Sequence, residues 1–189
     1  KTAMEMFDVR TPQGDPTGEV KERSAVHRDG DWHGTAHIWL VRRREGRIEL
    51  LLQKRSRTKE SFPGCYDTSC AGHLSAGDTF LEAALRELEE ELGIAASGEE
   101  LYFAGIYPCQ VDDYFGGKHI LDREISAVYL YEKPVNEADL RLQAEEVESV
   151  CWIDFERLKE LAAAGAEGYC IFPWETSALE SAFQRRYGI

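Results

Sequence analysis

The chain has 189 residues, 43% of them hydrophobic and 30% charged, which predicts a single domain over 1–189 with a core of its own. Its formal net charge of −13 argues against nonspecific nucleic-acid binding, because such binding needs a basic surface. The sequence has no run of about eighteen apolar residues, so no membrane span is expected. Its charged N-terminus lacks the apolar core of a signal peptide, and we therefore expect a cytoplasmic protein.

The five cysteines are an odd number, scattered in mostly apolar stretches, and they predict reduced thiols rather than a disulfide framework. Cys65, Cys70 and His73 lack a fourth ligand at usable spacing, which disfavours a structural zinc site. The sequence leaves the oligomeric state open, a dimer included.

Charge is distributed unevenly along the chain. Residues 42–59 hold eight Lys or Arg against two Glu. This segment is a candidate cradle for a phosphorylated ligand, and a solvated basic hairpin is the alternative interpretation.

The first part of the chain contains candidate strands and one long loop. An N-terminal strand region is expected at about 4–30. Residues 36–43 and 48–54 are rich in β-branched and other apolar residues, with "REG" at 44–46 between them, which predicts a hairpin. The segment 62–78, "FPGCYDTSCAGHLSAGD", is punctuated by proline and glycine and is expected to be a loop with one short strand.

A helix is expected next, ending at Leu92. Thr79 and Glu82 have capping-box spacing at its start, and Gly93 fits the position just past its end. The remaining elements are strands near 101–109, 121–131 and 147–153, and helices around 155–163 and 174–186. Because strands and helices do not alternate strictly, we expect a mixed sheet with helices on its faces rather than a doubly wound parallel sheet.

Four glutamates lie within positions 87–91, although like charges one turn apart on a helix repel by a few tenths of a kcal/mol. Projected at about 100° per residue, Glu87, Glu90 and Glu91 share one face. A separate apolar stripe consists of Leu81, Leu85, Leu88 and Leu92, and Ala83 and Ala84 are expected to leave the glutamate face open. The three carboxylates would suit a hard cation such as Mg²⁺; a solvated acidic face is the alternative.

The preceding loop favours the metal-binding interpretation. The segment 72–94 fits the spacing G-x5-[acid]-x7-R-E-U-x-E-E-x-G-U, in which U is a bulky aliphatic residue. The matching positions are Gly72, Asp78, Arg86, Glu87, Leu88, Glu90, Glu91, Gly93 and Ile94. This segment resembles the Nudix box, the signature of the Nudix superfamily, with Asp78 in place of the family's glutamate.

The resemblance implies an α/β fold, a Nudix-type α/β/α sandwich with a mixed β-sheet. It implies an enzyme that uses Mg²⁺ or Mn²⁺ to hydrolyse a diphosphate linkage in a nucleoside diphosphate derivative or another small organic diphosphate. By position, the metal ligands would be the carboxylates of Glu87, Glu90 and Glu91 and the carbonyl of Gly72. Arg86 would orient the carboxylates through Asp78, whose shorter side chain is expected to modulate activity without abolishing it.

Water attack at phosphorus builds negative charge, which divalent ions neutralise while lowering the pKa of a bound water. A nearby glutamate can accept the water's proton; the candidates are Glu90 and Glu91 within the box and Glu124 outside it. Candidates for substrate contact are Lys54, Arg55, His119 and Trp174, with Tyr114 as a second aromatic that could stack on a base. Charged strand ends and core aromatics are the structural alternatives.

Most of the chain also resembles the type 1 isopentenyl-diphosphate isomerases, which share the Nudix fold. The resemblance rests on "LLLQKRSRTKESFPGCYDTSCAGH", on "REIS" near Glu124 and on "FPW" at 172–174. It implies a different metal site, with candidate ligands His27, His33, His73, Asp122 and Glu124. The His27–His33 interval is one residue short of the isomerase pattern, and Asp122 replaces a glutamate.

One position separates the two enzyme classes. The isomerases move protons to and from carbon with a cysteine directly before the Gly-His pair, and that position is Ala71 here. Cys70 is adjacent, but a one-residue shift along a strand turns a side chain to the opposite face. The hydrolase pattern R-E-L-x-E-E is intact, so we predict hydrolysis, with isomerisation as the alternative. A non-catalytic Nudix-fold ligand sensor is a third hypothesis, which the complete set of box glutamates disfavours.

Overall fold

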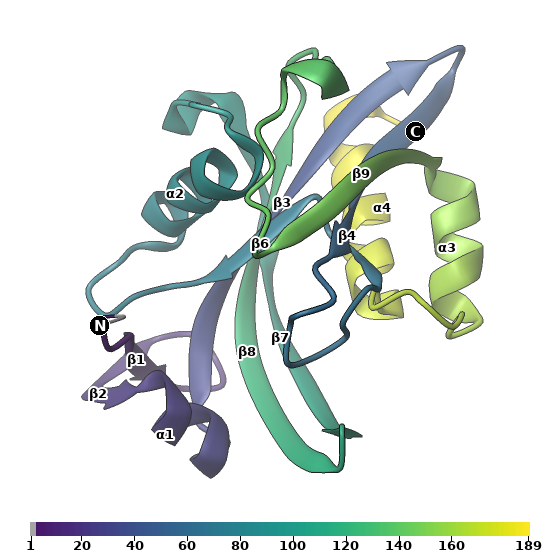
Figure 1. Cartoon of the computed structure of the whole chain (residues 1–189). Coiled ribbons are helices and arrows are strands. Elements are labelled where there is room, and N and C mark those ends of the chain that lie inside the picture. The colour runs from purple at the N-terminus through teal and green to yellow at the C-terminus, as the bar shows by residue number, and fades with distance from the viewer. Residues whose placement is uncertain (1–2) are drawn as a thin grey trace.

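The computed structural model describes residues 3–189, which form a seven-stranded mixed sheet, an N-terminal hairpin and four α-helices (Figure 1). The hairpin contains β1 (Met6–Arg10) and β2 (Pro16–Glu22). The sheet contains β3 (Trp32–Arg44), β4 (Arg47–Arg55), β5 (Tyr66–Asp67), β6 (Cys70–His73), β7 (Leu101–Phe115), β8 (Lys118–Tyr131) and β9 (Val147–Asp154). The helices are α1 (Arg23–Asp29), α2 (Phe80–Leu92), α3 (Phe155–Ala163) and α4 (Pro173–Tyr187), and short 3₁₀ turns cover Gly98–Glu100 and Glu137–Asp139. None of the helices in this part of the chain is long and apolar enough to cross a membrane.

β3 is the central strand, and it changes partner along its length. Trp32–Leu40 pair in parallel with β8, and within this stretch Thr35–Ile38 pair antiparallel with β6 on the other side. The last residues, Val41–Arg44, pair antiparallel with β4. The parallel pairing makes the sheet mixed, as the sequence predicts. Residues at alternate positions of a strand face the same side, so His33 and His37 project from one face of β3.

Helices cover both faces of the sheet. On one face, Leu88 of α2 packs in the same cluster as Ile38 of β3. On the other, Leu158 of α3 and Phe183 of α4 pack in a cluster with Trp39, the next residue of β3. Figure 1 shows α2 on one side of the sheet and α3 and α4 on the other. The predicted α/β/α sandwich is therefore confirmed.

α2 begins after the N-cap Thr79, which forms a capping box with Glu82, and ends before Gly93, as predicted. The predicted apolar stripe is wrong at its first position, because Leu81 is 37% exposed. Ala83 and Ala84 are fully buried instead. Their small side chains allow the helix to approach the sheet closely. The helix is therefore rotated about its axis relative to the prediction, and part of the glutamate face turns inward.

Two other regions differ from the sequence predictions. The N-terminal region at 4–30 is not all strand, because it ends in the helix α1. The loop expected between residues 109 and 121 is instead a continuation of β7 and β8, which pair up to a turn at Gly116 and Gly117. Both glycines have positive φ angles, 57° and 79°, which glycine adopts without steric cost. The result is a long two-stranded arm (Figure 1).

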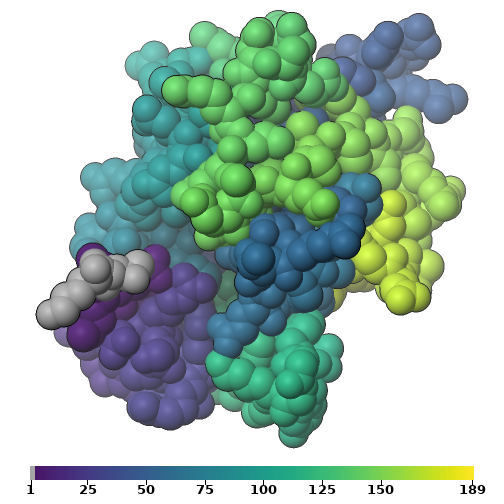
Figure 2. Space-filling model, in the orientation of Figure 1, coloured from purple at the N-terminus to yellow at the C-terminus, as the bar shows by residue number. Residues whose placement is uncertain are grey.

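The loop between β4 and β5 reaches this arm (Figure 2). The rings of Phe62 and Phe115 meet edge to face, with centroids 4.6 Å apart. Lys118 forms an ion pair with Glu60, a residue 58 positions away. The loop therefore packs against the arm near its turn.

Candidate functional site

Two overlapping groups of potential metal ligands lie near the start of β3. His27, His33 and His73 form one group, and His33, Asp122 and Glu124 form the other. Within each group the ligand atoms lie within 4.8 Å of one another. The fold thus brings together the five residues that the isomerase resemblance implies as a metal site, and we call these five residues the histidine cluster.

Strand register explains this convergence. His33 lies opposite Glu124 in the parallel pair of β3 and β8. His73 of β6 lies opposite the residue two positions after His33. Opposed residues on neighbouring strands share a face of the sheet, as do residues two apart, such as Asp122 and Glu124. His27 comes from α1, which follows the N-terminal hairpin and contacts β8.

The cluster contains four buried polar atoms without a hydrogen-bond partner among residues 3–189: Nε2 of His27, His33 and His73, and Oδ1 of Asp122. The Nε2 atoms of His33 and His27 lie 3.3 and 3.9 Å from Oδ1 of Asp122. Nε2 of His73 lies 3.6 Å from Oε1 of Glu124. Each unpaired buried polar group costs about 1–3 kcal/mol, and a cation bound within either group of ligands would give such atoms a partner. Imidazoles mixed with carboxylates suit Mn²⁺ or another first-row ion better than Mg²⁺.

Burial sets the protonation of the cluster. It lowers the pKa of His27 to about 4 and that of His73 to about 3, so both rings are neutral at neutral pH and can offer a nitrogen to a metal. Burial and the charge of Asp122 raise the pKa of Glu124 well above its usual range. Asp122 is shifted the other way despite its burial, because the neighbouring imidazole of His33 lowers its pKa. Without a metal, the two carboxylates titrate together as a pair, and their burial and mutual repulsion favour retention of a proton.

The Nudix-box glutamates of α2 lie against β6. A Cβ atom on Gly72 would come within 2.2 Å of Cδ of Glu87, so the glycine leaves room for this carboxylate beside the strand. Glu91 is 5% exposed and accepts a hydrogen bond from Nε2 of Gln53 at 2.7 Å. Glu90 is exposed. Two of the three box carboxylates therefore point into the protein, and the third faces solvent.

These two inward carboxylates hold protons more tightly than usual. Burial raises the pKa of Glu87 to about 7, and the charge of Glu90 adds to the shift. Burial likewise raises the pKa of Glu91 to about 8. The hydrogen bond from Gln53 opposes this shift in pKa, and the charge of Glu87 adds to it. A divalent cation would favour the ionised forms, so protons and metal compete for this pair.

β6 joins the two sets of candidate ligands. Gly72 faces Glu87, and the next residue, His73, projects from the other face of the strand into the histidine cluster. Arg86 donates to the carbonyl oxygen of His73 at 3.2 Å and to Oδ2 of Asp78 at 2.7 Å. The ion pair between Arg86 and Asp78 therefore forms although aspartate is one methylene shorter than glutamate.

Replacing Gly72 with alanine is expected to displace Glu87 without unfolding the chain. The added methyl would overlap Cγ and Cδ of Glu87, at 2.5 and 2.2 Å, and this flexible side chain can move away. We expect unfolding stability to change by about 1 kcal/mol and metal-dependent turnover to fall roughly 10- to 100-fold. Thermal unfolding and steady-state kinetics measure the two effects. Gly98→Ala, outside both clusters, is the control, and full turnover by Gly72→Ala would remove Glu87 from the site.

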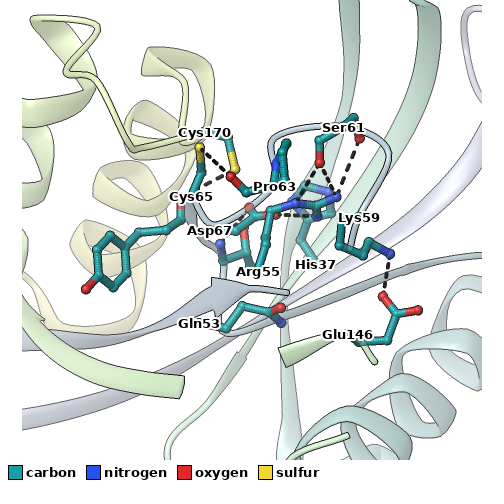
Figure 3. A network of polar contacts seen from close by, with 12 residues as sticks. His37, Gln53, Arg55, Lys59, Ser61, Pro63, Cys65, Asp67, Glu146 and Cys170 are labelled. Carbon is teal, nitrogen blue, oxygen red and sulfur yellow. Dashed lines mark hydrogen bonds and ion pairs between the residues drawn. The ribbon is translucent and has the colours of Figure 1, made fainter. Parts of the chain in front are cut away.

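The predicted phosphate-binding cations are both paired within the protein, and Figure 3 shows the contacts of Arg55. The guanidinium of Arg55 donates to the carbonyl oxygen of Ser61 at 2.9 Å and to Oδ2 of Asp67 at 3.1 Å. These bonds hold the loop that follows β4. Lys54 is 26% exposed, and its Nζ lies 3.6 Å from a carboxylate oxygen of Glu148. Lys54 is thus the more accessible of the two.

The other two predicted substrate contacts have different surroundings. His119 is exposed on the arm, with Nε2 2.6 Å from Oδ1 of Asp112. Its odd position in β8 places it on the face opposite to Asp122. Trp174 is half-buried in the first turn of α4, with its ring centroid 5.9 Å from that of His37. Trp174 therefore borders the face that carries the cluster, and His119 does not.

Three residues of this region have no signal in the sequence. Gln53 binds Glu91 across 38 positions of the chain. Nδ1 of His37 lies 2.8 Å from Oε2 of Glu175, a residue 138 positions away. Such contacts depend on how distant segments pack, so local spacing does not reveal them.

Comparison with known proteins identifies the family. The family model of the NUDIX domain matches residues 31–174. Nudix hydrolase 3 of Arabidopsis thaliana is 42% identical over 171 residues, which cover 88% of this chain but only 21% of that protein's length. A crystal structure of a Deinococcus radiodurans protein superposes with a TM-score of 0.66 at 20% identity, covering 92% of this chain and 98% of the other, which supports the fold alone. The chain belongs to the Nudix family, whose hydrolases are enzymes that act on phosphorus-containing anhydrides.

The resemblance to the isomerases is also confirmed, at lower identity. Isopentenyl-diphosphate Delta-isomerase 1 of Mesocricetus auratus is 34% identical over 140 residues, covering 67% of this chain and 59% of that protein. Ala71 lies opposite His37 and faces the histidine cluster, whereas Cys70 lies opposite Ile38 and is buried with α2. The strand therefore turns the Cys70 thiol away from the cluster, as the sequence predicts.

Proposed function

We propose that residues 1–189 form one domain that hydrolyses a diphosphate linkage in a small organic diphosphate, with Mg²⁺ or Mn²⁺ as cofactor and a nucleoside diphosphate derivative as the first candidate substrate. The observation that carries the proposal is the pair of ligand sets on the two faces of β6, at Gly72 and His73. Cations held there would neutralise the oxygens of adjacent phosphate groups. The named hydrolase relatives support the reaction class.

Each residue has one task in this proposal. When bound, the divalent ions supply charge neutralisation and a water of lowered pKa. Glu87 and Glu91, with the carbonyl of Gly72, would hold an ion on the α2 side. On the other side the ligands would be His27, His33, His73, Asp122 and Glu124. Arg86 orients the box, and exposed Glu90 accepts the proton of the attacking water, because it can pass that proton on to solvent.

One observation favours the isomerase alternative, namely that all five ligands of an isomerase-type metal site are close together. Ala71 opposes it, because no thiol occupies the position before the Gly-His pair. Cys109 lies opposite Glu124 in the pair of β7 and β8 and is a further thiol near the cluster. Burial raises the pKa of Cys109 to about 12, so this thiol would remain protonated at neutral pH. Hydrolysis remains the better supported reaction, because the hydrolase pattern R-E-L-x-E-E is intact and the position before the Gly-His pair is Ala71.

Two substrates offered side by side test the proposal. With Mg²⁺ or Mn²⁺ present, the protein is expected to release phosphate or a nucleoside monophosphate from a panel of nucleoside diphosphate derivatives. With isopentenyl diphosphate, we expect no allylic isomer. Phosphate release and product chromatography measure the two reactions. Isomer formation without phosphorus–oxygen cleavage would establish the isomerase, and nucleotide binding without turnover of either substrate would indicate the sensor.

A further inference from the structure

His37 lies on the same face of β3 as His33 of the histidine cluster, four residues further along the strand. A strand rises about 3.3 Å per residue, so roughly 13 Å separate the two positions. His37 lies opposite Ala71 of β6, and its ring centroid is 5.9 Å from that of Trp174. His37 is therefore within reach of a group attached to a diphosphate at the cluster, if that group extends along the strand past Ala71.

A buried acid fixes the orientation of this ring. Nδ1 of His37 lies 2.8 Å from Oε2 of Glu175, at the start of α4. The same oxygen accepts a hydrogen bond from Nε1 of Trp39 at 2.8 Å, and the Glu175 side chain is only 4% exposed. Two donors on one buried oxygen hold the carboxylate, and the carboxylate holds Nδ1 of His37. Glu175 therefore occupies the Nδ1 side of the ring and leaves the Nε2 side to other partners.

Nε2 of His37 is available to a ligand. Across residues 3–189 it forms no hydrogen bond, and it is not one of the fully buried unpaired atoms. The His37 side chain keeps 13% exposure, and Glu175 covers Nδ1, so the accessible edge is the one that carries Nε2. Although burial opposes it, Glu175 raises the pKa of His37 to about 9, with smaller contributions from Glu124 and Asp67. At neutral pH the ring is then a cation with a donor on Nε2.

We propose that Nε2 of His37 donates a hydrogen bond to an oxygen of the group attached to the diphosphate, which makes His37 a specificity-determining residue. This inference rests on the proposed hydrolase function and narrows its substrates to diphosphates with an oxygen-rich attached group, such as a sugar. A sugar oxygen would satisfy the charged donor. A hydrocarbon chain would cover the donor without providing an acceptor, and a site built to hydrogen-bond its substrate discriminates against ligands that lack the acceptor.

His37→Gln tests this assignment, because glutamine keeps a hydrogen-bonding partner for Glu175 but removes the cationic ring donor. With ADP-glucose as substrate, we expect kcat/KM to fall roughly 10- to 100-fold. With methyl diphosphate, which lacks the oxygen-rich group, we expect a change of less than about twofold. Glu175→Gln should reduce only the ADP-glucose reaction, because it removes the charge that holds the ring. Glu180→Gln, exposed on the same helix, is the matched control and should affect neither substrate.

Binding measurements separate this inference from the hydrolase proposal. Methylene-bridged analogues of the two substrates, titrated calorimetrically with Mg²⁺ present, report affinity without turnover. A selective 10- to 100-fold loss for the ADP-glucose analogue supports the role of His37, even if the wild type hydrolyses neither substrate and the hydrolase proposal fails. Unchanged affinity for that analogue, or equal losses for both, would overturn the inference. If thermal unfolding shows that His37→Gln does not fold, the same titrations are made with Glu175→Gln. A selective loss of affinity for the ADP-glucose analogue then supports the inference, and unchanged affinity or equal losses overturn it.

Discussion

Glu91→Gln is expected to lower the rate of metal-dependent diphosphate hydrolysis about a thousandfold while leaving the fold intact. Glu91 is 5% exposed and faces β6 beside Glu87. Glutamine has nearly the same shape and can keep the contact with Gln53, but it lacks the charge that a divalent ion needs. Steady-state kinetics at saturating Mg²⁺ measure the loss. Glu89→Gln, exposed on the same helix, is the control and should stay within about twofold of wild type.

The same substitution is expected to stabilise the metal-free protein at pH 8. The pKa of Glu91 is about 8 in the folded protein and 4.5 as the ordinary value, so the folded state binds more protons between these limits. Stability therefore falls as pH rises from about 4.5 to 8, and Glu87, with a pKa of about 7, acts in the same direction. Glu91→Gln removes its share, on the order of 4 kcal/mol at pH 8 and about 1 kcal/mol at pH 5.

Urea unfolding with a chelator present measures this difference. Equal stabilities of wild type and Glu91→Gln at pH 8 would show that burial does not destabilise the ionised form of Glu91. Adding Mg²⁺ should stabilise the wild type more at pH 8 than at pH 5, because metal and protons compete for the same carboxylates.

His33→Gln is expected to weaken Mn²⁺ binding about 100-fold, because His33 belongs to both ligand groups of the cluster. Its ring is buried and stacks on Phe7, with centroids 5.4 Å apart, so its orientation is fixed before an ion arrives. Calorimetric titration with Mn²⁺ measures affinity and stoichiometry. Glu91→Gln is the comparison variant, since it should leave the ion at the histidine cluster in place. Unchanged Mn²⁺ affinity in His33→Gln would show that the five residues do not form a metal site.

Local patterns predicted much of this fold. The capping residues of α2 and the glycine after it lie where their spacing indicates, and the hairpin of β3 and β4 follows its apolar runs. The arm was not predicted, because "GG" and the polar residues around it read as a loop. Asp112 and Asp113 disfavour a strand by their residue type. The two strands of the arm are stabilised by pairing with each other, and the local sequence does not reveal this pairing.

The site was predictable only in part. The spacing of the glutamates placed Glu87, Glu90 and Glu91 on one face, but it did not show that Glu91 is buried and Glu90 exposed. The histidine cluster followed from the resemblance to the isomerases rather than from spacing, since its members come from four separate elements. The pairing of His37 with Glu175 had no signal at all, because it depends on how α4 packs on the sheet.

Anomalous X-ray scattering from crystals grown with Mn²⁺ and methylene diphosphonate tests most directly whether this fold positions cations on both faces of β6 for a diphosphate. We predict one ion among His33, Asp122 and Glu124, a second between Glu87 and Glu91 beside Gly72, and the diphosphonate contacting both. Scattering peaks only at surface carboxylates, with the histidine rings and box glutamates unliganded, would contradict the account.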